Sequence, residues 1–375
     1  MATTAQRGPA LDLNQDVVSL TRAICDIESV SGDEGPLADA VEAALRGLGH
    51  LEVSRDGDAV VARTALGRGR RVVLAGHLDT VPLTRDDAGR VTNLPVRVEG
   101  TGSDAVLHGR GTVDMKGGVA VQLRLAAALP DPTFDVSYIF YDHEEVGADL
   151  NGLGRLARTL PGVLEADFAV LLEPTAGQVE GGCQGTMRVE VSTTGRASHS
   201  ARAWMGENAI HKAAPILARL AGYTPREVPI DGLVYREGMN AVGVSGGIAG
   251  NVIPDRCTVA VNYRFAPDRD VETAFAHVAE LFEGFDLVLT DAADGALPGL
   301  SHPAAKAFIE ATGGRPMPKF GWTDVSRFSA LGVPAVNFGP GDPMLAHRDD
   351  ERCPASQIVA CEQALTKWLS SDRGR

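Results

Sequence analysis

The stretch from Val72 to Asp79 reads VVLAGHLD, a short apolar run that ends in a histidine and, two positions later, an aspartate. An uninterrupted apolar run of this length is typical of a strand that is buried on both faces. Three further runs share this character, and they lie at Val136–Phe140, Phe168–Leu172 and Val333–Phe338. Helical patterns separate the first three runs, over 119–129 and 150–160. This alternation of strands and helices predicts an α/β domain with a mostly parallel sheet.

The residues before Val72 predict two helices and a hairpin. The first helix is indicated by apolar residues at helical spacing, namely Val17, Leu20, Ile24 and Ile27. The segment Ser31–Glu34 has the sequence of a capping box, which predicts that a second helix begins directly after it and stops at Gly49. Asp56-Gly57, between two strand-like segments, predicts a tight hairpin.

The pattern changes between about Gly181 and Gly295. Two segments alternate in polarity and two have helical periodicity, and they are Met187–Ser192, Thr258–Phe265, Glu207–Leu220 and Val271–Phe282. One sheet with two helices forms a small α+β unit, after which the α/β pattern resumes with helices expected near 304–311, 324–331 and 356–369. We therefore predict a discontinuous catalytic domain, residues 1–180 and 295–375, interrupted by an inserted domain, residues 181–294.

Composition limits the classes of function. The chain has 375 residues, of which 44% are hydrophobic, and a formal net charge of −14, so it can bury a large core but repels nucleic acid and anionic lipid. It has no apolar run long enough to span a bilayer, and the polar start, Met1–Ala10, does not resemble a signal peptide. The five cysteines are scattered without CxxC spacing, which is typical of reduced thiols and predicts a cytoplasmic protein.

Side chains that can bind metal ions follow the predicted strands. They are His77 and Asp79, Asp114, Glu144 and Glu145, Glu173, and His347. In open α/β sheets the ligand crevice lies at the carboxyl ends of the strands, where these residues fall. A set of histidines and carboxylates without cysteine suits Zn²⁺ or a related divalent ion. The adjacent glutamates weigh most, because two close carboxylates repel each other unless a cation neutralises them.

Each of these residues also has an ordinary structural interpretation. Asp114 could cap the helix that follows it. Glu144 and Glu145 could form a solvated turn, and His347, beside the charged run Arg348–Glu351, could lie in a surface loop. The metal hypothesis rests on all of them following strands.

Four segments together resemble the motifs of a known enzyme family. They are HLDTVP at 77–82, GRGTVDMKGG at 109–118, Glu144-Glu145, and Glu173-Pro174. In this order they resemble the co-catalytic di-zinc amidohydrolases, which include aminoacylase, acetylornithine deacetylase and succinyl-diaminopimelate desuccinylase. The resemblance spans roughly Val17 to Leu369. It implies a zinc-exopeptidase-like catalytic domain with a mixed, mostly parallel sheet, and an inserted ferredoxin-like dimerisation or lid domain.

The resemblance also implies a metal site. His77 and Glu173 would hold one zinc ion, His347 and Glu145 the other, and Asp114 would bridge both. It therefore implies two Zn²⁺ ions per chain, for which Co²⁺ can substitute.

Further roles follow from the same resemblance. Asp79 matches the carboxylate that orients the imidazole of His77, and Glu144 matches the general base. His199 matches an insert-domain histidine that enters the partner subunit's active site, which implies a homodimer formed through the inserted domain. Contacts to a small anionic substrate are expected from Asn251, Arg264 and Thr323, and from Arg202 near His199.

Three stretches resemble the actinobacterial type of desuccinylase within this family, namely Gly181–Thr186, Ala197–Asn208 and Gly250–Asp255. This implies hydrolysis of N-succinyl-LL-2,6-diaminopimelate to succinate and LL-2,6-diaminopimelate. Many desuccinylases have an arginine pair where this chain has Cys183-Gln184, so another N-acyl amino acid deacylase or a dipeptidase stays open. The residues flanking the glutamate pair, His143 and Val146, also depart from the wider family but leave the ligands intact.

Two motifs indicate other classes. Gly243–Gly247 matches the G-x-S-x-G of serine hydrolases, but its flanks resemble a strand with no helix after it. Gly152-Leu153-Gly154 is a weak, partial match to the glycine-rich dinucleotide-binding motif, and no clear strand pattern precedes it. A non-enzymatic metal-binding protein is disfavoured because Glu144 is present beside the ligands.

Overall fold

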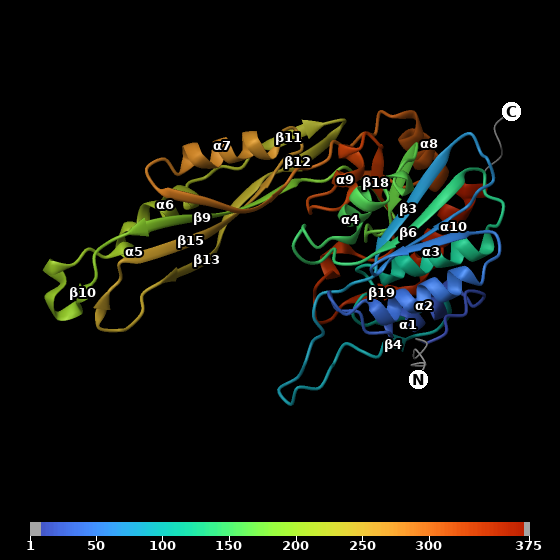
Figure 1. The fold of residues 1–375 in the computed structure, drawn as a ribbon, viewed down its shortest axis with the longest axis horizontal. Helices are drawn as coiled ribbons and strands as arrows, with labels where there is room; N and C mark the ends of the chain where they lie inside the picture. Colours follow the sequence, from blue (N-terminus) through green and yellow to red (C-terminus); the bar gives the residue numbers. More distant parts are fainter. Residues whose placement is uncertain (1–8, 371–375) are drawn as a thin grey trace. The chain divides into compact units, whose positions relative to one another are not determined.

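The computed structural model describes residues 9–370, which divide into two compact units (Figure 1). The first unit comprises the described residues up to Gly181, then Gly299–Met317 and the described residues from Arg327 onward. The second comprises Gly182–Pro298 and Pro318–Ser326, the latter a segment that the sequence analysis assigned to the resumed catalytic domain. Most of the polar start, Met1–Ala10, lies outside the described residues.

An eight-stranded mixed sheet organises the first unit. Its order is β1-β2-β6-β3-β7-β18-β8-β17, and the four strands β6, β3, β7 and β18 run parallel to one another at its centre. The strands are β1 (Glu52–Asp56), β2 (Ala59–Arg63), β3 (Arg71–His77), β6 (Asp135–Tyr141), β7 (Phe168–Leu171), β8 (Val179–Gly181), β17 (Pro316–Pro318) and β18 (Ala335–Asn337). The four central strands are the four apolar runs of the sequence, so the α/β prediction is confirmed.

The first unit also contains seven α-helices among its described residues and a small second sheet. The helices are α1 (Val17–Cys25), α2 (Gly35–Arg46), α3 (Lys116–Ala128), α4 (Gly152–Thr159), α8 (Pro303–Thr312), α9 (Val325–Ala330), whose first two residues are assigned to the second unit, and α10 (Ala355–Ser370). The small sheet has the order β19 (Arg352–Pro354), β5 (Val106–His108), β4 (Arg97–Glu99). Short 3₁₀ turns are η1 (Gly102–Asp104), η2 (Pro161–Val163) and η4 (Pro343–Leu345).

Most residues of helix α3 are buried, because the helix packs against α1, α10 and β3. Its first turn passes directly over the end of β7. A Cβ atom added at Gly118 would lie 2.2 Å from the carbonyl oxygen of Leu172, so only glycine permits this approach. Gly118 therefore allows the start of α3 to lie close to the strand end that Glu173 follows.

The predicted capping box is wrong. Helix α2 does begin at Gly35, but Glu34 at its N-cap makes no side-chain capping hydrogen bond. Instead the Ser31 hydroxyl donates to Asp79 Oδ2 at 2.7 Å, and Glu34 Oε2 accepts from the N–H of Gly32 at 2.9 Å. Helix α2 ends at Arg46, before the predicted stop at Gly49.

The second unit is built on an antiparallel sheet of order β13-β15-β9-β16. In chain order its strands and helices alternate as strand, helix, strand, strand, helix, strand, which is the ferredoxin-like arrangement. They are β9 (Gly185–Thr194), α5 (Ala209–Lys212), α6 (Ala214–Ala221), β13 (Gly238–Gly246), β15 (Arg256–Phe265), α7 (Val271–Leu281) and β16 (Asp286–Ala293). The helices bury one face of the sheet, where Ile216 and Val278 pack among residues such as Val189 and Val259.

Several details of this unit correct or refine the sequence analysis. The helix expected over 207–220 is two helices, α5 and α6, which meet at Ala213. Two short pairings are added, β11 (Glu227–Ile230) with β12 (Leu233–Arg236), and β10 (Ser198–His199) with β14 (Val252–Ile253), the latter next to the 3₁₀ turn η3 (Ser200–Met205). Ser245 lies within β13 opposite Thr258, so it is not on a nucleophile elbow.

Among residues 9–370, every helix is too short or too polar to cross a membrane.

Candidate metal centre

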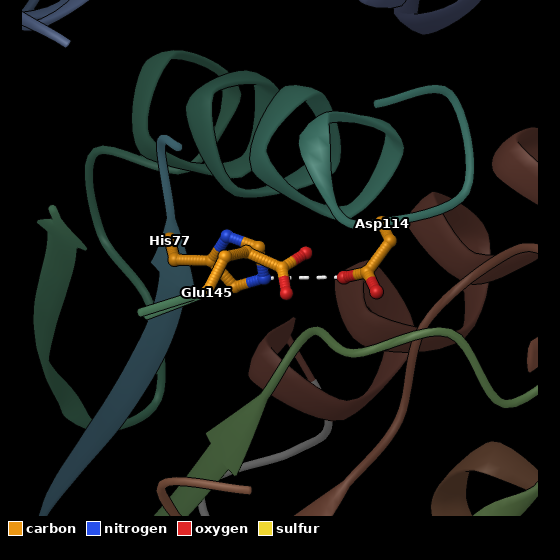
Figure 2. A group of neighbouring side chains, drawn as sticks. All are labelled: His77, Asp114 and Glu145. Atoms are coloured by element: carbon orange, nitrogen blue, oxygen red, sulfur yellow. Dashed lines mark hydrogen bonds and ion pairs between the residues drawn. The ribbon is translucent and has the colours of Figure 1, made fainter. Parts of the chain in front are cut away.

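Three potential ligands meet at the carboxyl end of the central strands (Figure 2). His77 ends β3, Glu145 follows β6, and Asp114 lies just before α3. One donor atom from each of the three lies within 4.8 Å of the others, and His77 Nε2 is 3.1 Å from Asp114 Oδ1. Because β3 and β6 are parallel neighbours, their ends bring His77 and Glu145 to the same edge of the sheet.

His347 completes this group from the loop before β19. Its Nε2 is 3.0 Å from Glu145 Oε1 and 3.4 Å from Asp114 Oδ2. Asp114 thus turns one carboxylate oxygen toward His77 and the other toward His347. A carboxylate placed between two imidazoles in this way can bridge two metal ions. The alternative that Asp114 caps α3 is wrong, since the N-cap residue is Met115 and has no side-chain capping bond.

Glu173 and Glu144 occupy the neighbouring positions. Glu173 is a buried residue that follows β7, and β7 pairs with β3 on the side opposite β6. Glu144 directly precedes Glu145, and its N–H donates to Asp79 Oδ1 at 3.0 Å. Of the five predicted ligands, four are therefore joined by short distances, and Glu173 lies at the end of the adjoining strand.

Asp79 contacts the imidazole of His77 through its backbone carbonyl as well as its carboxylate. The Nδ1 atom of His77 is 2.9 Å from the backbone carbonyl oxygen of Asp79 and 3.5 Å from its carboxylate. A carbonyl can only accept, so Nδ1 carries the proton and Nε2 is left as the ligand atom. The carboxylate of Asp79 also accepts from the N–H groups of Glu144 and Glu145, each at 3.0 Å.

The charged groups of this cluster shift one another's pKa values. Burial alone would lower the pKa of His77, but hydrogen bonds to Asp114 and Asp79 raise it well above its usual value. Hydrogen bonds to Asp114 and Glu145 raise the pKa of His347 to about 10. Burial would raise the pKa of Asp114, yet the two histidines hold it well below its usual range. Burial and the charge of Asp114 raise the pKa of Glu145.

This donor set fits divalent metal ions. Two imidazoles and two carboxylates converge, their remaining charge is negative when the imidazoles are neutral, and no thiolate is among them. Nitrogen and oxygen donors in this proportion are typical of Zn²⁺ and related ions. The raised pKa values of His77 and His347 reflect the negative charge around both side chains.

The remaining predicted site residues all belong to the second unit. His199 is exposed on β10, and its Nδ1 accepts from the N–H of Ala201 at 3.1 Å. Asn251 lies beside it, because its carbonyl oxygen accepts from the N–H of Ser200 at 2.9 Å. The others are Arg202, exposed in η3, Arg264, half-buried on β15, and Thr323, buried with its carbonyl oxygen 3.6 Å from Cys183 Sγ.

The sequence analysis missed one important carboxylate, Glu351. It is buried, its Oε1 accepts from the N–H groups of Val113 at 2.9 Å and Asp114 at 3.2 Å, and its Oε2 pairs with Arg110 at 2.8 Å. Glu351 therefore ties the loop of His347 to the loop of Asp114. No local pattern distinguishes it from Asp350, an exposed neighbour in the same charged run.

The fold and this cluster place the chain in a known class of hydrolases. Residues 73–371 match peptidase family M20/M25/M40, and the chain belongs to this family. A protein of Mycobacterium tuberculosis, provisionally named succinyl-diaminopimelate desuccinylase DapE, is 57% identical over 96% of this chain and 99% of its own length. The succinyl-diaminopimelate desuccinylase of Corynebacterium glutamicum is 48% identical over 96% of this chain and 98% of its own.

Solved structures share the fold at low identity. A tripeptidase from Staphylococcus aureus has a TM-score of 0.77 at 18% identity and covers 96% of this chain and 98% of its own. The Bacillus subtilis YXEP protein, a dinuclear metal-binding peptidase of the M20 family, has a TM-score of 0.67 at 16% identity and covers 94% of this chain and 96% of its own. These likenesses support the M20 peptidase fold.

We predict that metal binding releases protons from the histidines. At pH 7.5 His347 lies below its pKa of about 10 and is protonated, whereas ligation requires a neutral imidazole. The pKa of His77 is also raised. Loading the site should therefore release at least about one proton per chain near neutral pH, and fewer in His347→Ala. Calorimetric titration with Zn²⁺ in buffers of different ionisation enthalpy measures this number.

His211→Ala, which alters an exposed histidine of the second unit, is the control and should release as many protons as the wild type. Apparent affinity should rise with pH and level off as pH approaches 10, where His347 is deprotonated without metal. An affinity that does not change between pH 6 and 9 would contradict the prediction.

Proposed function

We propose that this chain is a two-zinc amide hydrolase that cleaves N-succinyl-LL-2,6-diaminopimelate to succinate and LL-2,6-diaminopimelate. The observation that carries the proposal is the convergence of His77, Asp114, Glu145 and His347. Glu144, the proposed general base, directly precedes Glu145 in the chain. The names of the two relatives at 57% and 48% identity support the choice of substrate.

The metal content is part of the proposal. Asp114 presents separate oxygens to His77 and His347, which suits two ions that share one carboxylate. We assign His77 and Glu173 to one ion and Glu145 and His347 to the other. Zn²⁺ is the proposed ion and Co²⁺ an alternative, since both accept imidazole and carboxylate ligands.

The chain's own residues would perform the proton transfers. When bound, two divalent ions activate water and polarise the amide carbonyl. Glu144 would accept the proton of the attacking water and pass it to the leaving amine, which must be protonated to depart. Because Nδ1 of His199 already accepts from Ala201, its neutral ring carries the proton on Nε2, and that N–H can stabilise a developing oxyanion.

The substrate is proposed to be held by residues of the second unit. Arg264 lies on the helix-free face of the sheet, and burial and the neighbouring Arg188 lower its pKa. The charge of Asp291 offsets part of this effect, and a substrate carboxylate would be a further suitable partner for the guanidinium. Asn251, Thr323 and Arg202 are proposed as further contacts.

We also propose a homodimer formed through the second unit. Strand β13 is an edge strand of its sheet, and its residues 240–246 are exposed. Large apolar side chains lie on and just beyond it, with exposures of 64% for Val242, 57% for Val244 and 87% for Ile248. An exposed apolar edge strand invites pairing with a second chain, which supports the dimer.

A cytoplasmic location remains a proposal that rests on the thiols. All five cysteines are buried and none forms a disulfide in the described chain. Buried free thiols are typical of proteins kept in a reducing compartment.

The substrate is tested by measuring amine release with added Zn²⁺. N-succinyl-LL-2,6-diaminopimelate, N-acetylornithine and a dipeptide are compared at equal enzyme. We expect kcat/KM to favour the succinylated substrate by about 10²-fold or more. With the other two compounds, the protein groups that bind the succinyl carboxylate would be left without a partner, which disfavours their transition states. Faster cleavage of the dipeptide or of N-acetylornithine would instead support the alternative deacylase or dipeptidase.

The roles of the adjacent glutamates are tested by matched amide substitutions. Glu144→Gln should lower kcat by about 10²–10⁴-fold and keep about two metal ions, since the amide cannot accept the proton. Glu145→Gln should weaken metal binding instead. Elemental analysis after gel filtration, beside steady-state kinetics, separates the two. Loss of metal from Glu144→Gln with a full complement in Glu145→Gln would reverse the assigned roles.

The role of His199 is tested by subunit complementation. His199→Ala and Glu144→Gln should each be nearly inactive alone. After mixing and subunit exchange, half of the dimers are mixed, and each has one site with Glu144 from its own chain and His199 from the other. About a quarter of wild-type activity should therefore return.

The controls separate this role from two others. If His199 is only a surface residue, His199→Ala alone keeps nearly full activity, as we expect for His211→Ala. If His199 serves its own subunit, mixing restores nothing although tagged chains show that exchange has occurred.

A further inference from the structure

We propose that Glu34, together with Ser31, is a positioning residue for the loop His143–Glu145. The expected effect on kcat rests on the proposed function, in which Glu144 is the general base. The positioning of Glu145 rests on the hydrogen bonds of the structure alone. Neither Glu34 nor Ser31 is among the predicted ligands or catalytic groups.

Three successive backbone N–H groups of this loop each donate to a carboxylate oxygen. The N–H of His143 donates to Glu34 Oε1 at 3.2 Å. Those of Glu144 and Glu145 donate to the two oxygens of Asp79, each at 3.0 Å. Two carboxylates from distant parts of the chain therefore fix the direction of the loop from which Glu144 and Glu145 project.

The loop needs this support because of its conformation. His143 has a φ of +57°, in the left-handed region that a residue with a side chain seldom adopts. Its Nδ1 is 2.7 Å from Asp142 Oδ2 and 3.4 Å from Glu34 Oε1, so the side chain is anchored on the same side as the backbone. Such a conformation persists only where surrounding contacts determine it.

The segment that carries Ser31 and Glu34 is itself fastened to the strand end. The N–H of Ser31 donates to the carbonyl of Thr80 at 3.1 Å, and the N–H of Thr80 donates to that of Ser29 at 2.9 Å. The Ser31 hydroxyl donates to Asp79 Oδ2 at 2.7 Å, and the N–H of Gly32 donates to Glu34 Oε2 at 2.9 Å. Ser31 therefore orients one carboxylate of the pair, while Gly32 orients the other.

A purely structural role explains these contacts less well. Glu34 is fully buried, and burying a carboxylate is costly unless each oxygen is satisfied. It does not cap helix α2, the usual reason for an acid at this position. Its two carboxylate oxygens accept from the N–H of Gly32 in its own loop and from the N–H of His143 in the loop of the glutamate pair. The buried carboxylate of Glu34 therefore fixes the position of one loop relative to the other.

The test uses Glu34→Ala and Glu34→Gln, with Ser31→Ala and Ser31→Thr as a second pair. Glu28→Ala is the control, because Glu28 is an exposed acid on the same segment. Each full-length variant is titrated with Co²⁺ and followed by visible absorption. His347→Ala identifies the binding step that belongs to the Glu145 and His347 pair, which we term the second step. Steady-state kcat and KM are measured on the metal-loaded enzyme, normalised to the folded fraction.

We expect Glu34→Ala to weaken the second Co²⁺ step by about 10-fold or more and to lower kcat by about 10- to 100-fold with little change in KM. The Co²⁺ affinity and kcat of Glu34→Gln should lie between those of the wild type and Glu34→Ala, because the amide keeps one acceptor oxygen. Ser31→Ala should show a smaller loss in the same direction, and Ser31→Thr should restore it through its hydroxyl. Glu28→Ala should match the wild type.

Wild-type Co²⁺ binding and kcat in the folded fraction of Glu34→Ala would overturn the proposal. If Glu34→Ala does not fold, the Ser31 pair decides, and equal Co²⁺ affinity and kcat in Ser31→Ala and Ser31→Thr would overturn it. The Co²⁺ titration needs no substrate. A wild type that fails to cleave N-succinyl-LL-2,6-diaminopimelate while Glu34→Ala still weakens the second step would refute the proposed substrate and leave this inference standing.

Discussion

Repulsion between carboxylates at one end of a parallel sheet is the constraint on which this structure depends. Asp114 and Glu145 lie within a few ångströms of each other, which is unfavourable unless positive charge lies between them. The negative charge around His77 and His347 raises the pKa of both side chains. The site is therefore built to hold cations, and the chain around it must keep acids in place that would otherwise move apart.

The means of keeping them in place is the same on both sides of the site. A buried carboxylate lies behind each ligand-bearing loop and accepts backbone N–H groups from it. Glu351 holds Val113 and Asp114, while Asp79 holds Glu144 and Glu145. Backbone donors fix the path of a loop regardless of its side chains, and they leave the side chains of the ligands free to turn toward the metal.

The two units contribute different chemistry. The first carries the proposed metal ligands and the adjacent acid on strand ends and on the loops near them. The second exposes His199, Arg202 and Asn251 and carries an edge strand with bare apolar side chains. An exposed apolar edge strand favours pairing with a second chain. A dimer formed in this way is also what the proposed role of His199 in the partner subunit's site requires.

The sequence by itself determined the strands, the α/β class and the candidate ligands, because these depend on apolar periodicity and on short motifs of neighbouring residues. It misjudged Ser31–Glu34, read as a helix cap, and overlooked Glu351, read as part of a solvated charged run. Only the tertiary structure decided their partners. Ser31 and Asp79 are 48 positions apart, Glu34 and His143 are 109 apart, and Glu351 and Val113 are 238 apart. A hydrogen bond of this kind depends on where the sheet brings two loops together, and no pattern within a few residues of either partner records that meeting.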